Sequence, residues 1–258
     1  MDNQRSTLRE MALFAGAGGG ILGGHLLGWE TVCAVEWEPY PASVLVARQN
    51  DGILPPFPIW DDVQTFDGKP WRGIVDVVSG GFPCQDISAA GKGGGIESER
   101  SGMWKQMARI IGEVKPQYAF VENSPMLTTR GLGTVLSDLA QMGFNAEWGV
   151  LSAEDVGANH LRERMWVVAK NTNTRCKHGK QGDTSELASN KAQRTASTIP
   201  NQSIFAGLDK NNWKTEPDVV RMVNGLADTV DRLKAIGNGQ VPLCAATAWQ
   251  LLTERLNA

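Results

Sequence analysis

Short apolar runs alternate with amphipathic stretches along the first 170 residues. The run that ends near Phe14 predicts a strand, and after a glycine turn the apolar spacing from about Gly19 predicts a helix. The same order recurs in TVCAVEW before PYPASVLVARQ, and in GIVDVVSGG before GMWKQMARIIGEV and QYAFVEN. Strands that alternate with helices form mostly parallel sheets covered on both faces. The pattern therefore predicts an α/β fold with a ligand crevice at the carboxyl ends of the strands.

Chemically active side chains follow the predicted strands. They are Glu36, Asp62, Cys84 and Glu122. Cys84 comes directly after a proline and before a glycine-rich loop, in GGFPCQDIS. A lone cysteine is most often a small buried apolar residue. The proline-stiffened turn instead favours a nucleophile beside a loop that can close over it.

Composition sets the broad class. The chain has 258 residues, is 41% hydrophobic and carries a net charge of −3, which suits one catalytic domain with a small appendage. Four scattered cysteines show no disulfide spacing, and no apolar run approaches the roughly 20 residues that cross a bilayer. We therefore expect a cytoplasmic protein that makes no membrane contact.

The sequence changes character after about Lys170. Residues 171–210 are rich in Asn, Thr, Ser, Lys and Gln and hold six Lys/Arg against three Asp/Glu. Composition alone leaves open a solvated insertion without a ligand. Apolar periodicity returns with the predicted helix LCAATAWQLL.

FAGAGGG and Glu36 together suggest an adenosine-containing cofactor. Glycines allow a tight turn and let backbone amides approach a ligand at the start of a helix. An acidic residue about 20 positions further on can hold a ribose diol. These features fit NAD, FAD and S-adenosylmethionine equally well, and a purely structural turn would also account for the glycines.

Seven motifs in order make the sequence resemble the C5-cytosine DNA methyltransferase family. They are FAGAGG at 14–19, Glu36-Trp37, Asp62-Val63, GFPCQ at 81–85, Glu122-Asn123, Arg162-Glu163-Arg164, and GNG at 237–239 with Val241-Pro242. The resemblance implies a Rossmann-like, S-adenosylmethionine-dependent methyltransferase fold. Residues 1–170 and 213–258 would form the catalytic domain, and residues 171–212 a small target-recognition insertion. The short length is typical of phage or prophage members.

The resemblance also implies catalytic roles for four residues. Cys84 would add to C6 of cytosine and so activate C5 toward the methyl group. Glu122 would bind the N3 and amino edge of the base. Arg162 and Arg164, two residues apart on one predicted strand and so on one face, would hold the O2 edge and a nearby phosphate. The base would be flipped out of duplex DNA, with residues 88–102 as the lid.

The residues that the resemblance assigns to S-adenosylmethionine come from strand ends and from the two glycine motifs. They are Phe14, Gly16, Ala17, Gly18, Gly19, Glu36, Trp37, Asp62, Val63, Pro83, Asn238 and Val241.

We expect no metal ion, S-adenosylhomocysteine as the product, double-stranded DNA as the partner, and a monomer in a bacterial or phage-infected cell. A short insertion should read a site of roughly 2 to 5 base pairs.

Some positions depart from the family pattern, and rival functions stay open. His160 stands where the family usually has Gln, and Ala158-Asn159 replaces its Val-Pro pair. A nicotinamide-dependent dehydrogenase would use the glycine turn, but that assignment gives Cys84 and Glu122 no shared catalytic role. A protein that grips DNA without modifying it and an enzyme that acts on transfer RNA are both compatible with these motifs.

Overall fold

The computed structural model describes residues 7–83, 102–173, 231, 234–235 and 237–258. Within these ranges a seven-stranded sheet has the order β3-β2-β1-β4-β5-β7-β6. Its strands are β1 (Arg9–Leu13), β2 (Glu30–Val35), β3 (Ile59–Trp60), β4 (Val77–Gly81), β5 (Tyr118–Asn123), β6 (Phe144–Leu151) and β7 (Arg164–Asn171). Strands β1 to β5 pair in parallel, and β7 runs antiparallel to both β5 and β6.

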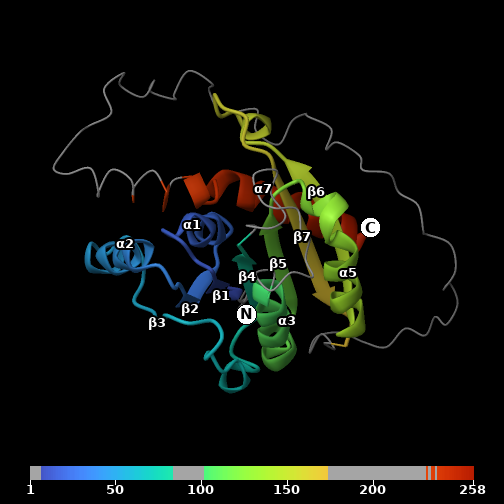
Figure 1. Ribbon diagram of the computed structural model, residues 1–258, viewed down its shortest axis with the longest axis horizontal. Helices are drawn as coiled ribbons and strands as arrows, with labels where there is room; N and C mark the ends of the chain where they lie inside the picture. The colour runs from blue at the N-terminus through green and yellow to red at the C-terminus, as the bar shows by residue number, and fades with distance from the viewer. Residues whose placement is uncertain (1–6, 84–101, 174–230, 232–233, 236) are drawn as a thin grey trace, which may run out of the picture.

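Helices cover both faces of this sheet, as the sequence pattern predicts (Figure 1). Helices α3 (Gly102–Val114), α4 (Leu127–Arg130) and α5 (Leu132–Gln141) pack on one face. Helices α1 (Gly19–Leu26), α2 (Pro39–Asn50) and α7 (Pro242–Asn257) pack on the other. Two short 3₁₀ helices, η1 (Lys69–Trp71) and η4 (Glu154–Val156), lie in connections. Of the described helices, none has both the length and the apolar character to span a bilayer.

Strand alternation decides which side chains meet the α1 and α7 face. Successive residues of a strand point to opposite faces. Phe120 of β5 and Trp166 of β7 stack at 5.2 Å beneath α7, whereas Ala119 and Val167 belong to the core under α3 and α5. By the same alternation Glu122 lies on the face that α1 and α7 cover.

Helix α7 packs closely against α1, which brings a segment far along the chain to the first glycine turn. Gly23 is buried in α1, and a Cβ there would lie 2.7 Å from the Cβ of Ala245 and 2.9 Å from the carbonyl oxygen of Pro242. The glycine therefore sets how closely the two helices approach. This contact determines where residues 238–240 lie.

Substituting Gly23 should destabilise the fold although alanine favours helices. We expect Gly23→Ala to lower the free energy of unfolding by about 1 to 2 kcal/mol, because the added methyl group overpacks the contact with α7. Gly133 of α5 has open space around its Cβ position, so Gly133→Ala should raise stability by about 0.5 kcal/mol. Urea denaturation followed by circular dichroism measures both. Equal stabilities of wild type and Gly23→Ala would contradict the packing argument.

Candidate active site

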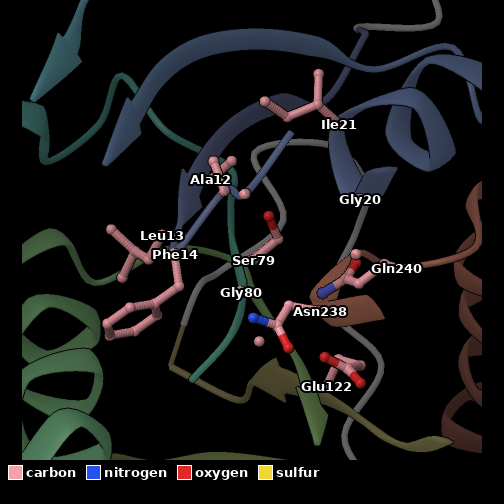
Figure 2. A pocket seen from close by; sticks show the side chains of 14 residues that line it. Ala12, Leu13, Phe14, Gly20, Ile21, Ser79, Gly80, Glu122, Asn238 and Gln240 are labelled. Carbon is pink, nitrogen blue, oxygen red and sulfur yellow. The ribbon is translucent and has the colours of Figure 1, made fainter. Parts of the chain in front are cut away.

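A pocket opens at the carboxyl ends of β1 and β4, between the start of α1 and residues 238–240 (Figure 2). Its lining includes Phe14, Gly16, Ser79, Glu122 and Asn238. The crevice is thus where the alternation of strands and helices predicts it. In Figure 2 the side chain of Phe14 lies on one side, and those of Asn238, Gln240 and Glu122 lie on the other.

The glycine turn between β1 and α1 adopts backbone conformations that few other residues tolerate. Gly18 caps α1 with a φ of 90°, and a Cβ there would lie 2.9 Å from Leu45 Cδ2. Phe14 also has a positive φ, 52°, which is uncommon for an aromatic residue and costs on the order of 1 kcal/mol. A Cβ at Gly19 or Gly20 would overlap Gln240. These two glycines therefore make room for the protein's own chain.

Glu36 directly follows β2 and holds the turn in shape. Its Oε2 accepts a hydrogen bond from the Gly16 amide at 2.6 Å, and its Oε1 accepts one from the Glu38 amide at 2.7 Å. Burial raises the pKa of this carboxyl, and the two backbone hydrogen bonds act against that rise. Each oxygen keeps a second lone pair, so the group can still accept hydrogen bonds from a ligand.

The predicted cofactor residues fall into two groups. Phe14, Gly16 and Asn238 line the pocket. The other assigned residues are not among the described lining residues: Ala17, Gly18, Gly19, Glu36, Trp37, Asp62, Val63, Pro83 and Val241.

The edge of the sheet beyond β2 presents Trp37, which is 70% exposed. Asp62 follows β3, and its Oδ1 accepts the Gln64 amide at 2.8 Å. The Val63 side chain is buried in the core, and its carbonyl oxygen accepts a hydrogen bond from Arg109.

Glu122 forms an ion pair at the rim of the pocket. The distance from Arg164 Nε to Glu122 Oε1 is 2.8 Å, with side chains 26% and 10% exposed. Burial raises the pKa of Glu122, whereas the positive charges of Arg164 and Arg162 and a hydrogen bond from Gln240 lower it. The carboxyl thus lies between two opposing influences, which is typical of groups that exchange protons in a reaction.

Arg162 does not share a strand with Arg164, so that part of the sequence interpretation is wrong. Strand β7 begins at Arg164, which pairs with Leu151, the last residue of β6. None of the described strands extends far enough to pair with residue 162. Arg162 Nη2 instead donates to the carbonyl oxygens of Gly237 at 2.6 Å and Gly239 at 2.5 Å. Its positive charge still lowers the pKa of Glu122.

Cys84, the predicted lid at 88–102 except for Gly102, which begins α3, and residues 174–230 lie outside the described residues. The strand that leads to Cys84 is fixed beside Glu122, because Gly81 pairs with Glu122 across β4 and β5. The Asn123 side chain then donates to the Phe82 carbonyl oxygen at 3.1 Å. The two cysteines within the described ranges, Cys33 and Cys244, are buried, and burial raises the pKa of each thiol to about 12.

A comparison with known families identifies the chain. The model of the C-5 cytosine-specific DNA methylases matches residues 8–239. The protein belongs to this family. Its fold, with a mostly parallel sheet and a buried acid at the crevice, is therefore that of a methylase domain.

Relatives of this methylase-family chain come from a virus and from bacteria. It is 32% identical to the type II methyltransferase M.CviJI of Paramecium bursaria Chlorella virus IL3A, over 63% of this chain and 43% of that protein. It is 34% identical to the type II methyltransferase M.NgoBI of Neisseria gonorrhoeae, over 62% of this chain and 50% of that protein. The chain thus spans about half the length of these relatives or less.

A solved structure supports the fold independently. The Entamoeba histolytica methyltransferase EhMeth superposes with a TM-score of 0.55 at 15% identity, covering 70% of this chain and 58% of that one. At this identity the likeness concerns the fold alone.

Sequence reasoning missed three residues of the site, Glu10, Ser79 and Gln240. Glu10 of β1 is fully buried, and its carboxyl accepts hydroxyl hydrogen bonds from Ser79 at 2.6 Å and Thr31 at 2.8 Å. Because Ser79 lines the pocket, Glu10 lies one hydrogen bond behind its wall. The run REMAL has the pattern of an ordinary strand, and its single acid gives no sign of burial.

The raised pKa of Glu10 should make the stability of the protein depend on pH. Burial raises the pKa of its carboxyl from 4.5 to about 7, so between these pH values the folded protein holds a proton that the unfolded chain releases. The contribution of Glu10 to the free energy of unfolding is therefore fully present below pH 4.5. It falls by about 3 kcal/mol as the pH rises through 7.

Urea denaturation from pH 4.5 to 8.5 tests this, with Glu10→Gln beside Glu30→Gln, an exposed acid of the neighbouring strand. The advantage of Glu10→Gln over wild type should grow with pH, and Glu30→Gln should track wild type. Parallel stability curves for Glu10→Gln and wild type would show that Glu10 does not titrate in this range.

Proposed function

We propose that the protein is a DNA (cytosine-5-)-methyltransferase. It transfers the methyl group of S-adenosylmethionine to C5 of a flipped cytosine in a short duplex site, through a covalent bond between Cys84 and C6. The observation that carries this proposal is the ion pair between buried Glu122 and partly buried Arg164. It lies at the glycine-turn pocket, and Glu122 is on the strand next to β4, the strand that leads to Cys84.

The pocket and the glycine turn beside it suit S-adenosylmethionine. Phe14 and Asn238 of the lining offer an aromatic face and an amide, and Glu36, which accepts a hydrogen bond from Gly16 of the turn, has lone pairs for a ribose diol. When bound, S-adenosylmethionine supplies an electrophilic methyl group. Trp37 and Asp62, at the neighbouring strand ends, would hold the adenine.

Cys84 acts as the nucleophile and Glu122 as the proton donor to the base. The Cys84 thiolate adds to C6, and the electron pair displaced from the C5–C6 double bond gives C5 enamine character. Glu122 donates a proton to N3 as negative charge builds on the ring, and burial favours the protonated carboxyl that this step needs. After C5 has been methylated, a base removes the C5 proton, and the electron pair of the C5–H bond re-forms the C5–C6 double bond and expels the Cys84 thiolate. The N3 proton then returns to the Glu122 carboxylate, which restores both the ring and the acid.

Arg164 and the polar insertion support substrate binding in this proposal. Arg164 holds Glu122 at 2.8 Å and can offer its remaining N–H groups to the O2 edge of the base. Residues 171–212 and the glycine-bearing loop after Cys84 would read the DNA, with phosphate contacts supplying much of the affinity. The catalytic domain would comprise residues 1–170 and 213–258 and act as a monomer.

Covalent trapping tests the reaction. DNA that carries 5-fluorocytosine should form a denaturation-resistant adduct with the protein when S-adenosylmethionine is present, because fluorine cannot leave as the C5 proton does. Cys84→Ser should form none, and Cys33→Ala, a change at a buried core position, should still form it. Adducts in Cys84→Ser, or methyl transfer to transfer RNA and not to DNA, would overturn the proposal.

Calorimetry tests the cofactor. S-adenosylhomocysteine should bind wild type, and Glu36→Ala should bind it at least about tenfold more weakly, because both the carboxylate and the turn that it holds are lost. Glu30→Ala, a change at an exposed position of the strand before Glu36, should bind like wild type. Tight binding of NAD with no binding of S-adenosylhomocysteine would favour a dehydrogenase.

A further inference from the structure

Gln240 contacts the catalytic acid proposed above, although the family motifs do not single it out. It stands two residues before α7 and lines the pocket, and its amide nitrogen and a Glu122 carboxyl oxygen lie together beside the Cβ position of Gly81. As a hydrogen-bond donor, this amide lowers the pKa of Glu122. Arg164 Nε donates to the same carboxyl at Oε1. Glu122 is therefore held by β7 and by the segment that precedes α7.

Three glycines make the space that Gln240 fills. A Cβ at Gly20 would overlap Gln240 Oε1, and a Cβ at Gly19 would overlap the Gln240 carbonyl oxygen. At Gly81 a Cβ would lie 3.0 Å from Gln240 Nε2 and would overlap Glu122 Oε2. The two ends of the amide thus lie against α1 and β4, and the nitrogen end is the one beside Glu122.

Arg162 fixes the backbone directly before this side chain. Its Nη2 donates to the carbonyl oxygens of Gly237 and Gly239. The same guanidinium also acts electrostatically on Glu122. One arginine therefore both balances the charge of the carboxyl and anchors the segment that carries Gln240.

A neutral partner has a specific chemical advantage here. Arg164 and Arg162 are the charged groups that act on Glu122, and both favour its ionised form. A third cation would favour that form further, whereas an amide N–H can donate to a carboxyl oxygen in either protonation state. An amide can therefore orient the carboxyl and still permit it to carry the proton that the reaction requires.

We propose that Gln240 is a positioning residue for methyl transfer, whose side-chain amide orients the Glu122 carboxyl toward the target base from the side opposite Arg164. This inference rests on the proposed function of Glu122. It predicts that Gln240 acts on the chemical step and little on the binding of S-adenosylmethionine.

Gln240→Met, which keeps an unbranched side chain of similar length, removes the amide. We expect kcat to fall about tenfold, with KM for S-adenosylmethionine and for DNA within about threefold of wild type. Gln141→Met, at an exposed position of α5, is the matched control and should leave both parameters unchanged.

The pH profile separates positioning from a general loss of structure. The part of the pH profile of kcat that reflects titration of Glu122 is identified by its loss in Glu122→Gln, and it is called the Glu122 limb below. Because the Gln240 hydrogen bond lowers the pKa of Glu122, its loss in Gln240→Met should move that limb to higher pH. Gln240→Glu places a like charge beside the carboxyl and should move it further in the same direction.

A pH titration of carbon-13-labelled glutamate carboxyls by NMR measures the pKa of Glu122 directly. It therefore tests the contact with Gln240 without an activity assay. Glu122→Gln assigns the Glu122 signal, and both Gln240 variants should raise its midpoint. If the wild type transfers no methyl group, the proposed function fails, and the titration still tests the contact.

The inference is overturned if folded Gln240→Met or Gln240→Glu leaves kcat and the Glu122 titration at wild-type values. It is equally overturned if KM for S-adenosylmethionine rises while kcat holds, since Gln240 would then be a cofactor contact. Thermal melting establishes which variants are folded, and if Gln240→Met does not fold, Gln240→Glu decides.

Discussion

A carboxyl group buried at the end of a sheet must be surrounded by donors, and this constraint on Glu122 organises the site. Burial alone favours the neutral acid. Arg164 from β7, the charge of Arg162 and the amide of Gln240 each act in the opposite direction. These partners come from two separate stretches of the chain, so the acid is correctly surrounded only when β5, β7 and the segment before α7 have all come together.

The close approach of α7 to α1 makes this arrangement possible. Gly23 lets the helices meet, and Gly19 and Gly20 leave space for Gln240 at the start of α1. A glycine turn that resembles a ligand cradle in the sequence thus has a second role in the fold. Glu36, which ties Gly16 to the end of β2, keeps the other half of the turn in the shape that a cofactor would need.

Local pattern predicts the parts of the structure that depend on local physics. The apolar stripe of α3, the strand that carries Glu122 and the crevice at the strand ends all follow from residue spacing, and the structure confirms them. The role of Arg162 could not be read in this way, because its partners lie 75 and 77 residues away and its place outside β7 depends on where β6 ends. Glu10 was missed because a single acid in an apolar strand gives no sign of its hydroxyl partners on β2 and β4.

Bisulfite sequencing of DNA from cells that express the protein tests the central claim most directly, with Glu122→Gln expressed at the same level as the comparison. The account predicts cytosines protected from conversion in one short sequence context with wild type, and a loss of most of that protection with Glu122→Gln. Complete conversion with folded wild-type protein, or equal protection with Glu122→Gln, would contradict the account of a cytosine-C5 methyltransferase that depends on this buried acid.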